Sequence, residues 1–84
     1  MMMNRDDVKE KVNRFLIEEL EIEEYKLSED ASLKEQVGID SLDYVDIIAF
    51  VGKTFGLKID KEELKDVSTL GQFYDYIKNR LCNV

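Results

Sequence analysis

Three stretches of the chain repeat apolar residues every three or four positions, which predicts three amphipathic α-helices. The first helix is expected to begin after Asn4, a good N-cap residue, and to end within the acidic run from Glu18 to Glu24, where like charges repel one another. Each predicted helix carries one apolar stripe for a core. The three stripes are Val8, Val12, Phe15, Leu16 and Leu20; Tyr44, Ile47, Ile48, Val51 and Phe55; and Leu70, Phe73, Tyr74, Ile77 and Leu81.

The second helix has recognisable signals at both ends. Gly38 suits a tight turn because glycine adopts positive φ at little cost, and Asp40 or Ser41 is the expected N-cap. Gly56 follows Phe55 in the position of a C-cap glycine. The helix is therefore predicted to run from about residue 41 to residue 55.

A shorter helix is predicted between the second and third stripes. Asp60, with an acid three residues later, forms a capping-box pattern, and the helix is expected to continue through about Lys65 with Leu64 facing inward. The last helix is expected to begin at Ser68 or Thr69. We find no convincing strand and no internal repeat.

The connection between the first and second helices is predicted to be a long irregular loop. No period persists from Tyr25 to Val37, so Tyr25, Leu27, Leu33 and Val37 are interpreted as single apolar residues that pin the loop to the core. Long connections of this kind in compact domains are often functional.

These elements predict an all-α fold, a small four-helix bundle with three main helices, one short helix and a long first connection. At 84 residues, the chain is expected to form one domain over 1–84. A core of this size is too modest to enclose a deep catalytic cleft.

The second helix carries more apolar surface than one core requires. Leu42, Val45 and Ala49 form a second stripe, offset from the first, and Asp46 lies beside it. A partner molecule would explain why this outer stripe is apolar.

Composition excludes several classes of function. The chain has no histidine and a single cysteine, which removes Ser-His-Asp and Cys-His catalysis, a disulfide framework and the common metal sites. Its net charge of -7 argues against binding to nucleic acid, whose phosphates select basic proteins. No apolar run approaches the ~20 residues of a membrane span, and a cytoplasmic location is expected.

Ser41 is the candidate for chemistry, as a residue that is modified rather than as a nucleophile. Its neighbours Asp40 and Asp43 are poor bases for a hydroxyl, so the chain is not expected to be an enzyme. A phosphoryl group on Ser41 would instead meet the positive end of a helix dipole and free backbone N–H groups.

The segment from Gly38 to Asp43 (Gly-Ile-Asp-Ser-Leu-Asp), placed before a long apolar helix that ends in Phe55-Gly56, resembles the acyl carrier proteins. Ile59 and the run Val67-Ser68-Thr69-Leu70 extend the resemblance over nearly the whole chain. The resemblance implies that Ser41 carries 4′-phosphopantetheine, installed from coenzyme A by a phosphopantetheinyl transferase. The thiol of that group would hold acyl chains as thioesters during fatty-acid, lipid or polyketide synthesis.

The resemblance also assigns the two stripes of the second helix. The inner stripe would line an interior that shelters the acyl chain. The outer stripe would face acyl-loading, condensing and modifying enzymes with basic docking surfaces, and the chain would act as a monomer. The partner-facing residues are Asp40, Leu42, Asp43, Val45, Asp46 and Ala49.

The later turns of this helix depart from the family pattern. Gly52 and Lys53 stand where relatives commonly have acids, which leaves the partners open. A peptidyl or aminoacyl carrier domain is one alternative, although acids before and after the serine favour an acyl carrier. An unmodified helical interaction module, in which Ser41 is only a cap, is another.

Overall fold

The computed structural model describes residues 4–82, and within them the chain is helical apart from turns and short extended connections. Over these residues, the one pairing of extended backbone is an isolated antiparallel bridge between Ser32 and Thr69. The all-α prediction is confirmed. The helices are α1 (Arg5–Glu18), α2 (Ser41–Phe55), α3 (Lys61–Lys65) and α4 (Leu70–Cys82), with a 3₁₀ turn η1 (Glu24–Lys26) and a π-helical turn η2 (Leu33–Val37) between α1 and α2.

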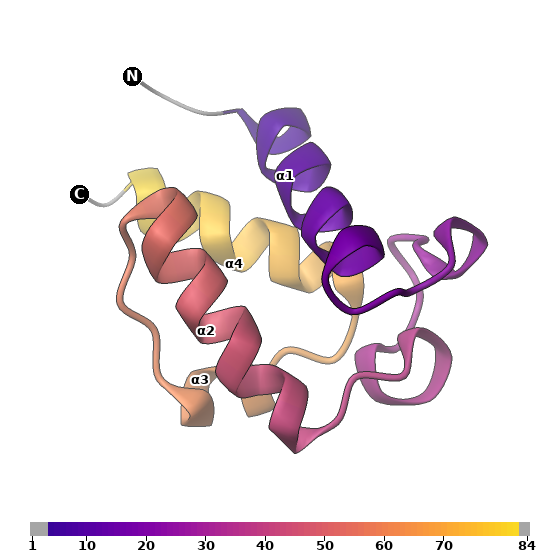
Figure 1. The fold of residues 1–84 in the computed structure, drawn as a ribbon. Coiled ribbons are helices and arrows are strands. Elements are labelled where there is room, and N and C mark those ends of the chain that lie inside the picture. The colour runs from indigo at the N-terminus through magenta and orange to yellow at the C-terminus, as the bar shows by residue number, and fades with distance from the viewer. Residues whose placement is uncertain (1–3, 83–84) are drawn as a thin grey trace.

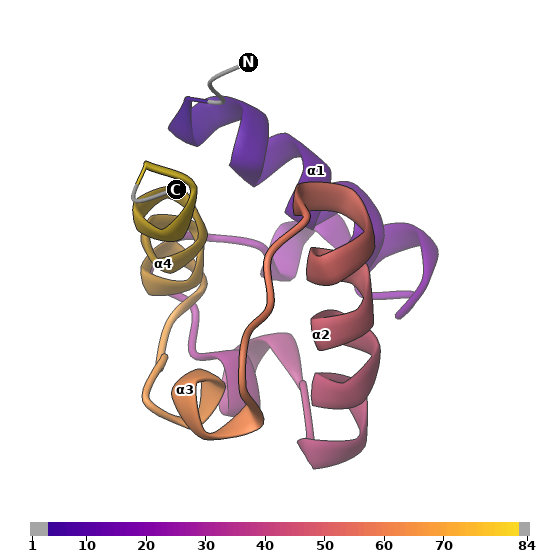
Figure 2. The ribbon, with the colours of Figure 1, turned by 90° about the vertical axis from the view of Figure 1, so that its left-hand side faces the viewer.

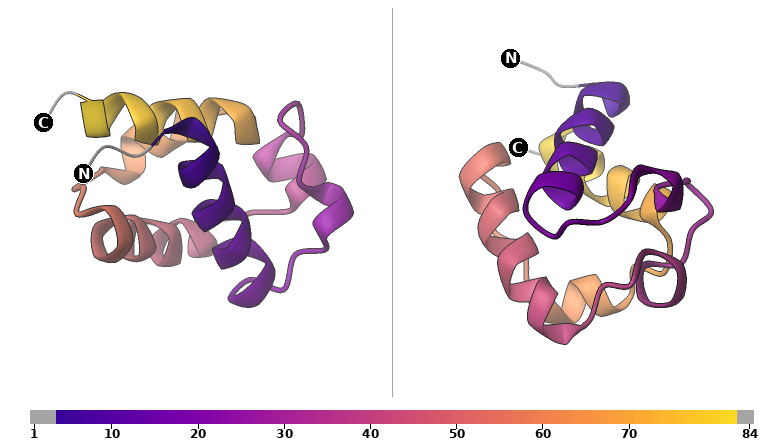
Figure 3. Two further views of the ribbon diagram at one scale, coloured as in Figure 1. Left: turned by 90° about the horizontal axis from the view of Figure 1, so that it is seen from above. Right: turned by 45° about the vertical axis from the view of Figure 1, so that its right-hand side comes forward.

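The helices surround one core (Figure 1). Seen from the side, α2 and α4 lie on opposite sides of the bundle, α1 lies across one end, and the short α3 lies near the other (Figure 2). α1 packs against α4, and α3 packs against α2. The further views show the connection with η1 and η2 extending to one side of the helices (Figure 3). Ser41 therefore lies where this connection meets α2.

The predicted inner stripes form the core. Val8, Val12 and Leu16 of α1 are at most 1% exposed, and the inward residues of α2 and α4 are similarly buried. The outer members of the stripes are only partly buried and close the edges of the core. Those partly buried members are Phe15, Leu20, Ile48, Phe55 and Leu81.

The connection between α1 and α2 differs from the structureless loop that we expected. Leu33 and Val37 are buried as predicted, but they belong to the π-helical turn η2. Tyr25 is 78% exposed, so its predicted role as a core contact is wrong. Tyr25 lies in η1 among charged residues, and its ring has the Lys26 ammonium 6.0 Å from its centroid rather than core side chains around it.

Side-chain caps hold η2 and the turn that follows it. The Ser32 hydroxyl accepts a hydrogen bond from the N–H of Glu35 at 3.3 Å, and the Ser32 N–H donates to the Gln36 side chain at 2.8 Å. Gly38 then takes a φ of 87°, as expected for a glycine in a tight turn. The N–H of Ile39 donates to the carbonyl oxygen of Leu33 at 2.8 Å. This compact turn sets the point at which α2 begins.

Arg5 ties α1, the connection and α4 together. Its guanidinium lies 2.6 Å from the Glu29 carboxylate and 2.6 Å from the Asp75 carboxylate. The hydrogen bond from Arg5 lowers the pKa of Glu29 below its ordinary value. Lys9 adds a longer contact of 3.7 Å to Glu29.

Gly71 lies so close to the connection that a larger residue does not fit. Its N–H donates to the Glu29 carbonyl oxygen at 2.9 Å, beside a second hydrogen bond from Leu70 to Ala31 at 3.0 Å. A Cβ on Gly71 would lie 2.9 Å from that same Glu29 oxygen. The start of α4 is thus fixed against the connection by backbone contacts.

This approach predicts that Gly71→Ala destabilises the protein. Alanine gains ~1 kcal/mol of helix propensity over glycine, but the clash with the Glu29 backbone must shift α4 or the connection, at a cost of roughly 1–3 kcal/mol. We expect a lower midpoint in urea-induced unfolding.

Gly52→Ala is the matched control. At this exposed position of α2, a Cβ would meet the Leu57 oxygen at an ordinary 3.5 Å, so the substitution should stabilise the protein by up to ~1 kcal/mol. Equal stabilisation by both substitutions would contradict the proposed close approach at Gly71.

Candidate functional site

Ser41 is the first residue of α2 and its side chain is exposed. Among the residues that the structure describes, its hydroxyl has no hydrogen-bonding partner. Asp40, and not Ser41, is the N-cap, which resolves the two possibilities left open by the sequence. The serine hydroxyl is therefore available at the surface and is not needed to start the helix.

A reciprocal capping box holds this helix start. The Asp40 carboxylate accepts hydrogen bonds from the N–H groups of Leu42 at 2.9 Å and Asp43 at 3.2 Å. The Asp43 carboxylate accepts in return from the Asp40 N–H at 3.2 Å. Both acids that flank Ser41 thus have a structural task of their own.

This capping box bears on one expectation from the sequence. We expected free N–H groups at the start of α2 to stabilise a phosphate on Ser41, but the Asp40 carboxylate already accepts from those of Leu42 and Asp43. A phosphate there would also meet the negative charges of Asp40 and Asp43. The N–H groups of Leu42 and Asp43 are thus engaged by Asp40, and among the described residues no partner is found for the N–H of Ser41.

The predicted outer stripe of α2 is exposed. Leu42 is 78% exposed, Val45 is 60% exposed, and Ala49 continues the stripe along the helix. Asp46 is exposed beside it, and no ion pair to its carboxylate occurs within residues 4–82. The stripe begins directly after Ser41, so an apolar surface and the free hydroxyl lie on one helix.

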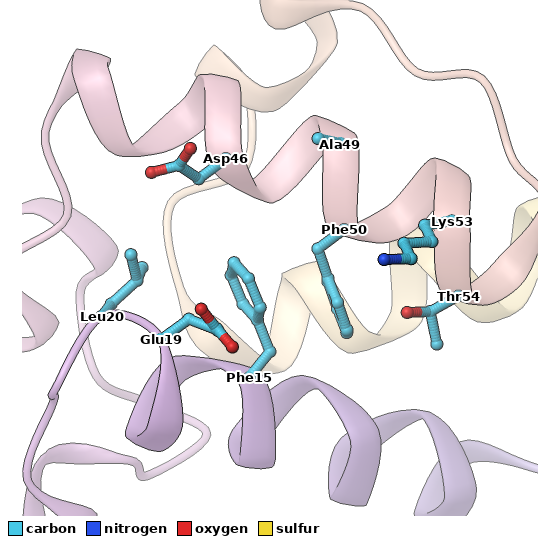
Figure 4. A pocket seen from close by; sticks show the side chains of 8 residues that line it. All are labelled: Phe15, Glu19, Leu20, Asp46, Ala49, Phe50, Lys53 and Thr54. Carbon is cyan, nitrogen blue, oxygen red and sulfur yellow. The ribbon is translucent and has the colours of Figure 1, made fainter.

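A groove of about 510 Å³ runs between the end of α1 and the part of α2 from Asp46 to Thr54 (Figure 4). Its lining includes the stacked pair Phe15 and Phe50, with ring centroids 4.2 Å apart, which stand between the two helices. Asp46 and Lys53 of α2 and Glu19 at the end of α1 also line it. The sequence analysis did not predict a role for Phe50, which lies between the inner and outer stripes of α2. The only sign of a role in the sequence was that a large aromatic residue occurs at a position that belongs to neither stripe.

The core of the bundle is closed. A space of only about 10 Å³ remains among residues of α1, η2, α2, α3 and α4 and of the turn before α2, close to the least volume that holds one water molecule. An acyl chain could enter only if these side chains moved apart. The space is lined by Leu16, Leu33, Ile39, Tyr44, Ile47, Leu64, Leu70 and Phe73.

No group of three or more metal-ligating side chains gathers within residues 4–82. No helix within that range is long and apolar enough to cross a membrane.

Comparison with known proteins decides the family. A family model described as a phosphopantetheine attachment site matches residues 10–77. The chain is 35% identical over 80 residues to an acyl carrier protein of Thermotoga maritima. The aligned region covers 95% of this chain and 99% of the relative. The chain belongs to the acyl carrier protein family.

Two further acyl carrier proteins support this membership. One from Thermosynechococcus vestitus is 32% identical over 80 residues, covering 95% of this chain and 99% of the relative. One from Buchnera aphidicola is 31% identical over 74 residues, covering 88% and 92%. The cofactor of this acyl carrier protein is accordingly 4′-phosphopantetheine.

The capping box yields a prediction about stability. Asp40→Ala removes the acceptor for two N–H groups of α2, and loss of such a cap costs ~1 kcal/mol. Urea-induced unfolding should show this loss, and hydrogen exchange should speed up at the amides of Leu42 and Asp43. Asp46→Ala on the same helix is the control, expected within about 0.5 kcal/mol of wild type. If the two variants lose equal stability, the carboxylate of Asp40 is not an effective cap.

Proposed function

We propose that Ser41 is the residue that carries 4′-phosphopantetheine, and that residues 1–84 act as one carrier domain. The observation that carries this proposal is the exposed Ser41 hydroxyl at the first position of α2, without a partner among the described residues. A transferase needs an accessible hydroxyl that is not committed to the fold. Asp40 supports the assignment because it performs the capping that would otherwise engage a serine.

The carried group supplies a thiol that holds acyl chains as thioesters. The chain's own residues present and position the group. Asp40 and Asp43 fix the start of α2, and the turn at Gly38 sets where that start projects. In this proposal the chain is a carrier and not an enzyme.

The outer stripe of α2 is the proposed docking surface for partner enzymes. Leu42, Val45 and Ala49 supply its apolar part, and Asp46 supplies a charge without an ion-pair partner among residues 4–82, which suits a basic docking surface. Asp40 and Asp43 lie at its edge and contribute charge while they cap the helix. Such a small patch suits brief encounters, in which rim charges set the association rate more than the affinity.

The partners are a phosphopantetheinyl transferase and the acyl-loading, condensing and modifying enzymes of fatty-acid, lipid or polyketide synthesis. The names of the relatives favour acyl cargo over a peptidyl or aminoacyl cargo. We place the carrier in the cytoplasm, as a monomer.

The attachment is tested by mass. Incubation with coenzyme A and a broad-specificity phosphopantetheinyl transferase should add one phosphopantetheine group to the wild type and none to Ser41→Ala. Intact-mass measurement reads both results. Ser28→Ala, at an exposed serine of the connection, is the control and should load like the wild type. A mass gain that survives Ser41→Ala would refute the assignment.

The docking surface is tested by charge and salt. Asp46→Lys should lower kcat/KM of the transferase by roughly three- to tenfold at ~10 mM salt, and by much less at ~1 M salt, where charges are screened beyond about 3 Å. Asp30→Lys makes the same charge change at an exposed position in the connection and serves as the control. An equal loss at low and high salt would mean that Asp46 does not act through charge.

A further inference from the structure

The groove between α1 and α2 carries charges of opposite sign at its two ends. Figure 4 shows the acids Glu19 and Asp46 toward one end and the base Lys53 toward the other. The stacked rings of Phe15 and Phe50 lie between them and are only half-buried. An apolar centre is therefore flanked by an acidic end and a basic end.

An adjoining hollow of about 250 Å³ extends the basic end. It shares the aromatic pair and Thr54 with the groove and is also lined by Lys11, Arg14 and Glu18 of α1. Lys11 lies about one turn before the aromatic residue of α1, and Glu18 lies about one turn after it. Since the two helices bring the end of α1 beside the first half of α2, Lys11 falls at the end of the groove where Thr54 lies.

The protein itself leaves most of these charges without a counterion. Arg14 lies 3.5 Å from Glu10, and both side chains are exposed. Within residues 4–82, no ion pair engages the other charged residues that flank the rings: Lys11, Glu18, Glu19, Asp46 and Lys53. Charges arranged in this way favour a partner whose own charges have the opposite order.

The walls of the groove favour a helix as the occupant. Both walls are α-helices, whose backbone N–H and C=O groups pair within the helix, so an extended segment would find no backbone partners there. A helix satisfies its own backbone groups and needs only side-chain contacts. The wall from Asp46 to Thr54 rises about 12 Å, which matches roughly two turns of a partner helix and suits a transient contact.

We propose that the α1–α2 groove is a second docking surface, which takes an amphipathic helix of a partner protein. That helix presents an apolar side chain to the aromatic pair, a base toward Glu19 and Asp46, and an acid toward Lys53. The groove borders the outer stripe of α2, because Ala49 belongs to both. The inference goes beyond the attachment at Ser41 and does not depend on it.

The test uses a stapled helical peptide of about three turns as the probe. One face of the peptide carries a leucine with glutamates on one side and equally many lysines on the other, and circular dichroism confirms that it is helical. Titration into the ¹⁵N-labelled, unmodified protein at ~10 mM salt follows the backbone amide shifts. We expect the largest shifts around Phe15 and Phe50 and little change on the exposed face of α4.

Two further peptides separate the ends of the groove. In one the glutamates are replaced by glutamine, and in the other the lysines are. Lys53→Glu should raise the Kd of the full peptide roughly three- to fivefold, but should not weaken binding of the peptide without glutamates. Glu19→Lys should raise the Kd of the full peptide by a similar factor, but should not weaken binding of the peptide without lysines.

Lys58→Glu is the matched control. Lys58 is exposed and lies outside the groove, so the substitution changes the net charge of the protein as Lys53→Glu does. The full peptide is neutral, and its Kd should stay at the wild-type value.

Three results would overturn the proposal. The first is a helical peptide that leaves the groove amides unshifted. The second is an equal rise in the Kd of the full peptide for Lys53→Glu and Lys58→Glu, or equal weakening of all three peptides by Lys53→Glu. The third is a shift of the groove amides when the protein alone is concentrated, which would mean that a second copy of the chain occupies the groove.

Discussion

The burial of one face of α2 is the constraint on which the rest of the structure depends. Tyr44, Ile47 and Val51 are at most 3% exposed, and they fix the rotation of α2 about its own axis. Once that rotation is fixed, Leu42 and Val45 must face outward, because side chains around a helix cannot all reach one core. Packing therefore decides that these positions face outward, although it does not require them to be apolar, and the proposed docking surface would take its geometry from the core.

The elements that secure the fold lie apart from that surface. Arg5 joins α1 to Glu29 and Asp75, and Gly71 brings α4 against the backbone of the connection. None of these contacts uses the outer stripe of α2. Substitutions in the stripe, including Ala49, should therefore have little effect on folding, because the contacts that secure the fold lie elsewhere.

Sequence reasoning succeeded where a residue's role is local or periodic. The helix stripes, the cap at Asn4 and the positive φ of Gly38 and Gly56 followed from spacing and residue type. It failed where a long-range arrangement decides. Tyr25 is a large aromatic residue of the kind that often lies in a core, yet the turn in which it lies places it in solvent.

At the candidate site, too, local features were predictable from the sequence and long-range contacts were not. The position of Ser41 at a helix start was predictable from Gly38 and Asp40. The sequence allowed either Asp40 or Ser41 to cap the helix, and only the structure shows that the Asp40 carboxylate takes the N–H groups of Leu42 and Asp43. The stacking of Phe50 on Phe15 was equally hidden, since these residues lie 35 positions apart in the sequence and meet only when α1 and α2 pack.

The capping box has a consequence for how an acyl carrier delivers its cargo. In the proposed attachment at Ser41, the phosphodiester would lie beside the N–H groups of Leu42 and Asp43, which the Asp40 carboxylate already engages. The arm then behaves as a tether. The chance that its thiol meets an active site is set by an effective concentration that depends on arm length and on where α2 docks. In that proposal, the Asp40 cap would leave the arm fewer free N–H groups at the helix end.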